Sequence, residues 1–243
     1  MTKNWFKNTG PGTLVAAAFI GPGTVTLCTL AGVNYGFHLL WAMLLSILAT
    51  VVLQEMAARL GIISQKGLSE VIKSEIKHPI INKLMMLLIL SAIVVGNASY
   101  EAGNISGGIL GLETIVGEIR VNLGSYSLNI LSLVVGIIAF TLLYIGNYKF
   151  LERVLVSLVL LMSVSFLITA FLTKPDIMSI FKGALVPSVP EGSLLTIIGL
   201  IGTTVVPYNL FLHASLVKEK WSDQKDLKAV RKDTIISIVL GGL

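Results

Sequence analysis

Apolar runs of about the length of a membrane span recur along the chain, and short polar loops separate them. An α-helix needs about 20 residues to cross the hydrocarbon core of a bilayer. Because 54% of the residues are hydrophobic and only 13% are charged, a soluble core of this size could not bury the apolar surface. The pattern predicts an all-α polytopic membrane protein with one transmembrane domain over residues 1–243 and spans at residues 12–35, 38–62, 82–112, 127–146, 151–173 and 193–217.

Two further segments are too short to be complete spans. The run 234–243 is about half as long as a bilayer requires. We therefore expect the chain to be a fragment that is truncated in its seventh helix, and the alternative is a short terminal helix in the membrane interface. The segment 64–78 is polar but repeats apolar residues at helical spacing, which predicts a short amphipathic helix at the inner surface.

The distribution of basic residues predicts the orientation in the membrane. When the N-terminus is placed inside, only Arg120, Lys174 and Lys182 of the 18 Lys and Arg residues fall in outside segments. Cytoplasmic loops carry an excess of Lys and Arg. We therefore expect a multi-pass integral membrane protein, in a bacterial-type inner membrane, with a cytoplasmic N-terminus.

Charge and motif content exclude several functional classes. The net charge of +5 could suggest nucleic acid, but the charges lie in short loops between apolar runs. We expect membrane lipid as a partner and do not expect nucleic acid. The oligomeric state is left open. Cys28 is the only cysteine, and the sequence contains no HExxH, GxSxG or P-loop motif. We predict neither an enzyme nor a resident cofactor.

The first apolar run contains a predicted helix break. The motif GPGT occurs at Gly10–Thr13, where proline suits the start of a helix, and again inside the run at Gly21–Thr24. Pro22 lacks a backbone N–H, and the glycines beside it have low helix propensity. Because Leu14–Gly21 would make only about 12 Å of helix, we expect the chain to unwind near the middle of the membrane.

The sixth run contains a similar interruption, in which Thr203 and Thr204 are followed by two valines and then by Pro207. Unwound backbone at membrane depth is tolerated only where it lines a cavity or is buried in protein. Paired interruptions in corresponding positions point to the binding site of a secondary transporter. We predict a site between the two breaks, and two ordinary proline kinks are the alternative.

Around these breaks the chain resembles the Nramp family of divalent-metal transporters. The likeness extends from about Gly10 to Trp221 and rests on GPGTLVAAAFIGPGT in the first run, QEMAARLG in the second, Leu151–Met162 in the fifth and GTTVVPYNLFLHAS in the sixth. The resemblance implies an inverted-repeat fold of five plus five helices, with discontinuous first and sixth helices and the substrate between them. It leaves proton coupling open.

The metal-ligand motif of the family is incomplete in this chain. The resemblance places Gly21 and Thr24 where the family has Asp and Asn, and Val206 and Tyr208 where it has Met and His. Thr203 stands where the family offers a backbone carbonyl. The candidate substrate-binding residues are Gly21, Thr24, Thr203, Val206, Tyr208 and Asn209, and the candidate metal positions, through backbone or hydroxyl oxygen, are Gly21, Thr24 and Thr203.

These replacements leave neutral oxygens at both breaks and change the expected substrate. Hard, neutral oxygens disfavour soft-metal selectivity and suit a hydrated hard cation such as Mg²⁺. We therefore predict an Nramp-like secondary transporter of divalent cations that favours Mg²⁺ over Mn²⁺ or Fe²⁺. A transporter of a neutral or anionic solute on the same scaffold and a non-transporting relative are the alternatives.

Two titratable residues could supply what the breaks lack. Glu101 lies deep in the third run, where an acid is a functional candidate; it could carry charge, relay a proton or belong to a structural network. His213, one turn after the second break, could line the inner exit and titrate near neutral pH, or it could be a packed, hydrogen-bonded histidine. Glu55 and Arg59 are spaced for a salt bridge.

Overall fold

The computed structural model describes residues 10–124, 126–146 and 148–242 and is almost entirely helical. Its elements, in chain order, are α1 (Pro11–Phe19), α2 (Pro22–Tyr35), α3 (Leu40–Ser64), α4 (Leu68–Glu75), α5 (Pro79–Val116), β1 (Arg120–Leu123), β2 (Tyr126–Asn129), α6 (Ile130–Ile145), α7 (Tyr148–Thr173), α8 (Ile177–Leu185), α9 (Leu194–Thr204), α10 (Pro207–Lys220), a 3₁₀ turn (Gln224–Asp226) and α11 (Leu227–Gly242).

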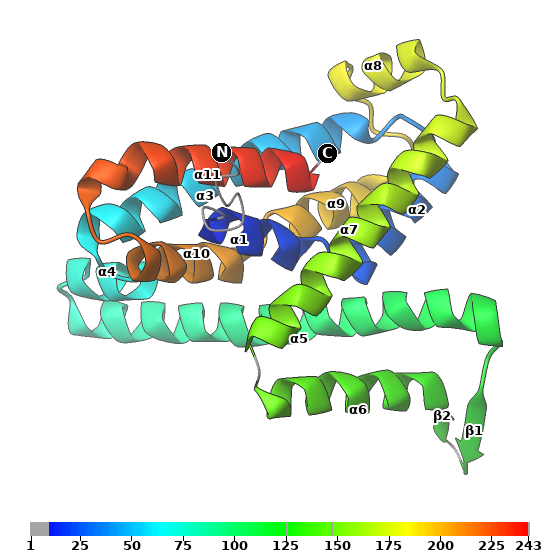
Figure 1. Ribbon diagram of the computed structural model, residues 1–243, viewed down its shortest axis with the longest axis horizontal. Helices are drawn as coiled ribbons and strands as arrows, with labels where there is room; N and C mark the ends of the chain where they lie inside the picture. The colour runs from blue at the N-terminus through cyan, green and yellow to red at the C-terminus, as the bar shows by residue number, and fades with distance from the viewer. Residues whose placement is uncertain (1–9, 125, 147, 243) are drawn as a thin grey trace, which may run out of the picture.

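The helices near the two ends of the chain form the core bundle (Figure 1). There α3 packs against α10 and α11, and α1 lies against the same two helices. The half-helix α2 leaves this bundle and packs between α5 and α9. The long helix α5 runs along one side of the bundle, with α6 beside it (Figure 1). This arrangement brings α1, α2, α5 and α9 to the two breaks.

Several of the described helices are suited to a membrane. Three are long and apolar enough to cross one, at Leu40–Ser64, Pro79–Val116 and, with its break included, Leu194–Lys220. The pair α1–α2 passes the same test but bends by 54° at its break, and Leu161–Thr173 with α8 bends by 118°. The chain is therefore built as an integral membrane protein.

The loops contain structure that the apolar pattern did not predict. Residues 127–129 form part of a β-hairpin, in which Arg120 pairs with Asn129, and not the start of a helix. The Asn129 side chain accepts a hydrogen bond from the Leu131 N–H at 3.0 Å and so caps α6. Asp176 caps α8 in the same way, through the N–H groups of Met178 and Ser179. The short run 234–243 belongs to a helix that begins earlier, at Leu227.

The predicted amphipathic helix is α4, which is joined to the C-terminal end of α10. The Glu70 carboxylate accepts hydrogen bonds from the Gly67 N–H and from the Lys218 ammonium, both at 3.2 Å. These contacts stabilise the ionised form, and the pKa of Glu70 is lowered from its usual value. The pair links α4 to the bundle, while the position of α4 at a membrane surface stays a prediction.

A carboxylate from α11 holds the N-terminus of α1. The Gly10 and Gly12 N–H groups donate to the two oxygens of Asp233, at 2.8 and 2.9 Å. Neither glycine has room for a Cβ atom, because Asp233 occupies that space. A negative charge at a helix N-terminus is favourable and satisfies backbone donors that have no partner in the helix. This contact fixes the end of α1 opposite the first break.

Candidate functional site

The first break lies between α1 and α2. The helix α1 ends at Phe19, Gly21 is extended at φ −126° and ψ 168°, and α2 begins at Pro22. Proline at the first position of a helix needs no N–H partner, so the same residue ends one helix and begins the next. The unwinding frees the Phe19 carbonyl from the helical ladder, as the sequence predicted.

The second break lies between α9 and α10. The helix α9 ends at Thr204, Val206 is extended at φ −95° and ψ 117°, and Pro207 begins α10. Here the chain unwinds for two residues, and the carbonyl of Thr203 lies at the end of α9. Both predicted interruptions are thus present, and each places a backbone carbonyl at the end of a half-helix.

A tyrosine from α5 joins the two breaks. The Tyr100 hydroxyl lies 2.7 Å from the Phe19 carbonyl oxygen, to which it donates, and 3.5 Å from the Thr203 carbonyl oxygen. The Thr24 hydroxyl donates to the same Phe19 oxygen at 2.9 Å and lies 3.2 Å from the Tyr100 hydroxyl. We call this group of four oxygens, from Phe19, Thr24, Tyr100 and Thr203, the oxygen cluster. All of its members are neutral.

Three of the predicted site residues lie in or beside the oxygen cluster. Thr24 contributes its hydroxyl, and Thr203 contributes its carbonyl, because its own hydroxyl turns back to the Leu200 carbonyl at 3.0 Å. Gly21 is buried at the first break. These three residues are the candidate metal positions that were predicted from the sequence.

The other three predicted site residues take different places. Val206 is only 4% exposed and packs with Phe19 in an apolar cluster. Tyr208 packs edge-to-face against Tyr100, with ring centroids 5.9 Å apart. Asn209 is fully buried, and its amide has no hydrogen-bond partner in the described part of the chain. The Val206 side chain and the Tyr208 ring therefore pack beside Tyr100 of the oxygen cluster.

The two residues that were predicted to carry charge or relay a proton lie in different environments. Glu101 is exposed on α5 and directly follows Tyr100 in the sequence. His213 is fully buried: its Nδ1 lies 2.9 Å from Gln54 Oε1, and its Nε2 lies 3.4 Å from the Thr234 hydroxyl. These contacts fit a neutral ring that donates from Nδ1 and accepts at Nε2. His213 thus joins α3, α10 and α11, as in the packed alternative.

Glu55 forms the predicted salt bridge, together with a second one. Its carboxylate lies 3.7 Å from Arg59, at i+4, and 2.5 Å from Arg231 on α11. The closer partner is therefore distant in sequence, and the pair adds a tie between α3 and α11.

Two residues beside the breaks, Tyr100 and Asn104, were not among the candidate site residues predicted from the sequence; they lie one turn apart on α5. The Asn104 carboxamide oxygen accepts a hydrogen bond from the Gly23 N–H at 3.4 Å, at the start of α2. Their spacing of four residues puts both on one helix face, and this i, i+4 polar pair in an apolar helix was the available signal.

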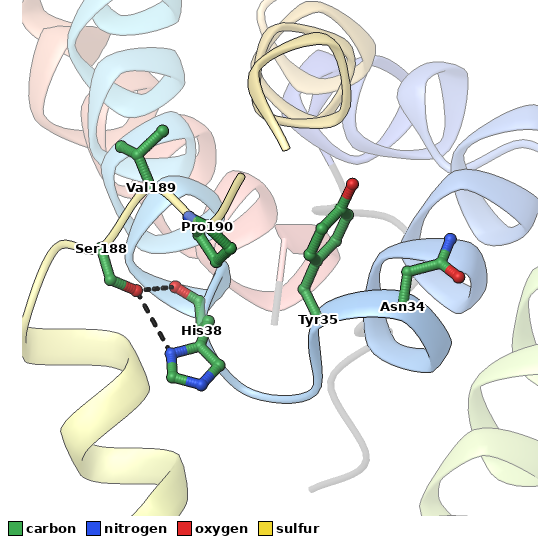
Figure 2. A pocket seen from close by; sticks show the side chains of 6 residues that line it. All are labelled: Asn34, Tyr35, His38, Ser188, Val189 and Pro190. Carbon is green, nitrogen blue, oxygen red and sulfur yellow. Dashed lines mark hydrogen bonds between the residues drawn. The ribbon is translucent and has the colours of Figure 1, made fainter. Parts of the chain in front are cut away.

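Features of other site types lie elsewhere. Within the described residues, no group of three or more His, Cys, Asp or Glu side chains is arranged to hold a metal ion. A cavity of about 480 Å³ lies at the far end of α2, where Tyr35, His38 and Ser188 line it (Figure 2). The Ser188 hydroxyl lies 3.3 Å from His38 Nδ1 and donates to the His38 carbonyl. This cavity is separate from the oxygen cluster.

Comparisons with known proteins agree with this architecture. The solved structures of a manganese transporter from Eremococcus coleocola match all of this chain with TM-scores of 0.69 and 0.72, at 22% identity and over 51% of their own length. The chain therefore has the inverted-repeat fold with discontinuous first and sixth helices, of which it carries about half.

Two of the sequence relatives are metal transporters by name. The chain is 28% identical to the metal transporter nramp1 homolog of Dictyostelium discoideum and 26% identical to the divalent metal cation transporter MntH of Chromohalobacter salexigens. The matches cover 94% and 99% of this chain but 41% and 55% of those relatives. The family model described as natural resistance-associated macrophage protein-like matches residues 12–243. The chain belongs to the Nramp family.

Proposed function

We propose that this chain is the site-bearing half of a divalent-cation transporter, not an enzyme, and that the cation binds at the oxygen cluster. The observation that carries the proposal is the Tyr100 hydroxyl, which contacts the carbonyls of Phe19 at the first break and Thr203 at the second. Carbonyl and hydroxyl oxygens are ligands that hard cations accept. Membership of the Nramp family and the names of the relatives support the substrate class.

Within this class, we propose Mg²⁺ as the favoured substrate. The oxygen cluster contains no carboxylate, thioether or imidazole group. A bare dication in a membrane interior needs compensating negative charge, which neutral oxygens do not supply. Mg²⁺ keeps several of its waters when it binds, so a neutral site that leaves those waters in place suits it, and the cluster lacks the softer nitrogen or sulfur ligands that select transition metals.

An occupied backbone donor at the start of α2 weighs against an anionic substrate at the first break. An anion would bind to free N–H groups at the half-helix N-termini. The N–H groups of Gly10 and Gly12 already donate to Asp233, and the Gly23 N–H donates to Asn104. At the first break, one N–H group at the start of α2 is therefore taken by an acceptor from the protein itself, and Asp233 takes the N–H groups at the other end of α1.

The distribution of Lys and Arg supports a cytoplasmic N-terminus, and we propose placement in a bacterial-type inner membrane. Glu101 is the acid nearest to the oxygen cluster in sequence, so it is our candidate for proton coupling. Membrane lipid and a small inorganic ion are the partners that this account requires.

Flux measurements test the proposed function. The full-length protein that contains this chain is reconstituted in liposomes, and influx of Mg²⁺ and of Mn²⁺ is followed with and without a pH gradient. We expect saturable Mg²⁺ influx that exceeds Mn²⁺ influx at equal concentration. Preferred Mn²⁺ influx would refute the Mg²⁺ assignment alone, and an absence of flux for both ions would refute cation transport.

A further inference from the structure

The carboxamide of Asn104 occupies the space that a side chain on residue 21 would take. A Cβ atom built on Gly21 would collide with the Asn104 carboxamide oxygen. The same oxygen accepts a hydrogen bond from the Gly23 N–H, so its position is held by the start of α2. A carbonyl oxygen has two lone pairs, and the Gly23 contact uses one of them.

Close packing fixes α5 against the first break. A Cβ atom on Gly23 would lie 3.1 Å from the Gly103 backbone, and one on Gly107 would lie 2.7 Å from the Pro22 carbonyl oxygen. These glycines let the two backbones approach, in the way that small residues do in membrane helix pairs. Asn104 is therefore held closely against the first break, one helical turn along α5 from Tyr100, whose hydroxyl belongs to the oxygen cluster.

We propose that Asn104 is a specificity-determining residue of the cation site, because it supplies a neutral oxygen at the place that a residue-21 side chain would otherwise fill. The inference rests on the proposed function. A side chain on residue 21 and the Asn104 side chain would occupy the same space, so only one of them can supply a polar group there. The residue that supplies this group sets its charge. A neutral carboxamide there favours a hydrated hard cation, whereas a carboxylate would favour a more fully dehydrated one.

The first experiment adds one negative charge without a change of shape. Mn²⁺ and Mg²⁺ binding to the full-length protein is measured by calorimetry for the wild type and for Asn104→Asp. The new carboxylate should keep its contact with the positive N-terminus of α2 and raise Mn²⁺ affinity by about tenfold, because it adds a charged ligand to a neutral set. The Mg²⁺/Mn²⁺ selectivity should fall accordingly.

A variant of the same helix serves as the matched control. Asn97→Asp adds the same charge to α5 about 10 Å further along its axis, and Asn97 is exposed. Mn²⁺ affinity should stay within about twofold of the wild type, because position 97 lies two helical turns from Asn104 and makes no contact with the oxygen cluster. Equal effects of Asn104→Asp and Asn97→Asp, or no effect of either in a protein that binds Mg²⁺, would overturn the inference alone. A wild type that binds neither ion would refute the proposed function.

A second experiment tests the shared space without any cation. Gly21→Ala should lower the Tm by about 5 °C, because it forces overpacking against Asn104. Asn104→Ala in the same protein should restore most of that loss, since the smaller side chain vacates the space. A Gly21→Ala effect that is equally large with Asn104 and with Ala at position 104 would show that the two residues do not compete, and would overturn the inference.

Discussion

Tyr100→Phe should reduce the initial rate of Mg²⁺ influx by about 30-fold, because it removes the hydroxyl that joins the carbonyls of both breaks and with it about 2 kcal/mol of binding. The phenylalanine ring keeps the edge-to-face contact with Tyr208. The Phe19 carbonyl also keeps its hydrogen bond from Thr24. The fold should therefore survive, with a loss of stability of about 1 kcal/mol.

Tyr144→Phe is the control for this experiment. Tyr144 lies on α6, is 83% exposed and is far in sequence from both breaks. The same hydroxyl deletion there should leave influx unchanged. If Tyr100→Phe transports Mg²⁺ as fast as the wild type while thermal unfolding confirms equal folded fractions, the oxygen cluster is not the cation site.

Asp233→Ala should destabilise the protein by about 2 kcal/mol, since the N-terminus of α1 loses two hydrogen bonds to a carboxylate. In thermal unfolding this corresponds to a Tm lower by about 6 °C for a domain of this size. Hydrogen exchange at the first amides of α1 should become faster, because these groups lose the cap that the described residues give them. Asp233→Asn keeps one acceptor and should lose about half as much stability.

Asp226→Ala is the matched control for Asp233→Ala. Asp226 precedes Asp233 by two helical turns and makes no side-chain hydrogen bond or ion pair that involves the described residues. Its removal should lower the Tm by at most about 2 °C, through the charge lost at the start of α11, and should leave the exchange of α1 unchanged. A similar loss for both variants would mean that negative charge near α11, and not the cap on α1, is what stabilises the protein.

Local sequence predicted the helices and both breaks, because their causes are local. Pro22 and Pro207 each remove a backbone donor and restrict the preceding residue whatever surrounds them. The apolar runs can likewise be read locally, because each span must match the apolar interior of the bilayer. The hairpin at 120–129 was missed because its strands have four residues each, too few for a clear alternating pattern.

The walls of the candidate site depend on contacts between residues distant in sequence. Tyr100 reaches carbonyls 81 and 103 residues away, and His213 pairs with Gln54 across 159 residues. Spacing along one helix does not show which neighbour a side chain faces. The family resemblance directed attention to Val206, yet the rotation of the chain at the second break places its side chain in the apolar cluster.

The position of the bound cation tests the central claim most directly. Crystals of the full-length protein are soaked in Mn²⁺, whose anomalous scattering marks the ion, and then in Mn²⁺ with excess Mg²⁺. The account predicts one peak at about 2 to 3 Å from the oxygens of Phe19, Tyr100 and Thr203, or one water layer further, and its loss in excess Mg²⁺. A peak elsewhere, such as the cavity beside His38 (Figure 2), or a peak that Mg²⁺ does not displace, would contradict it.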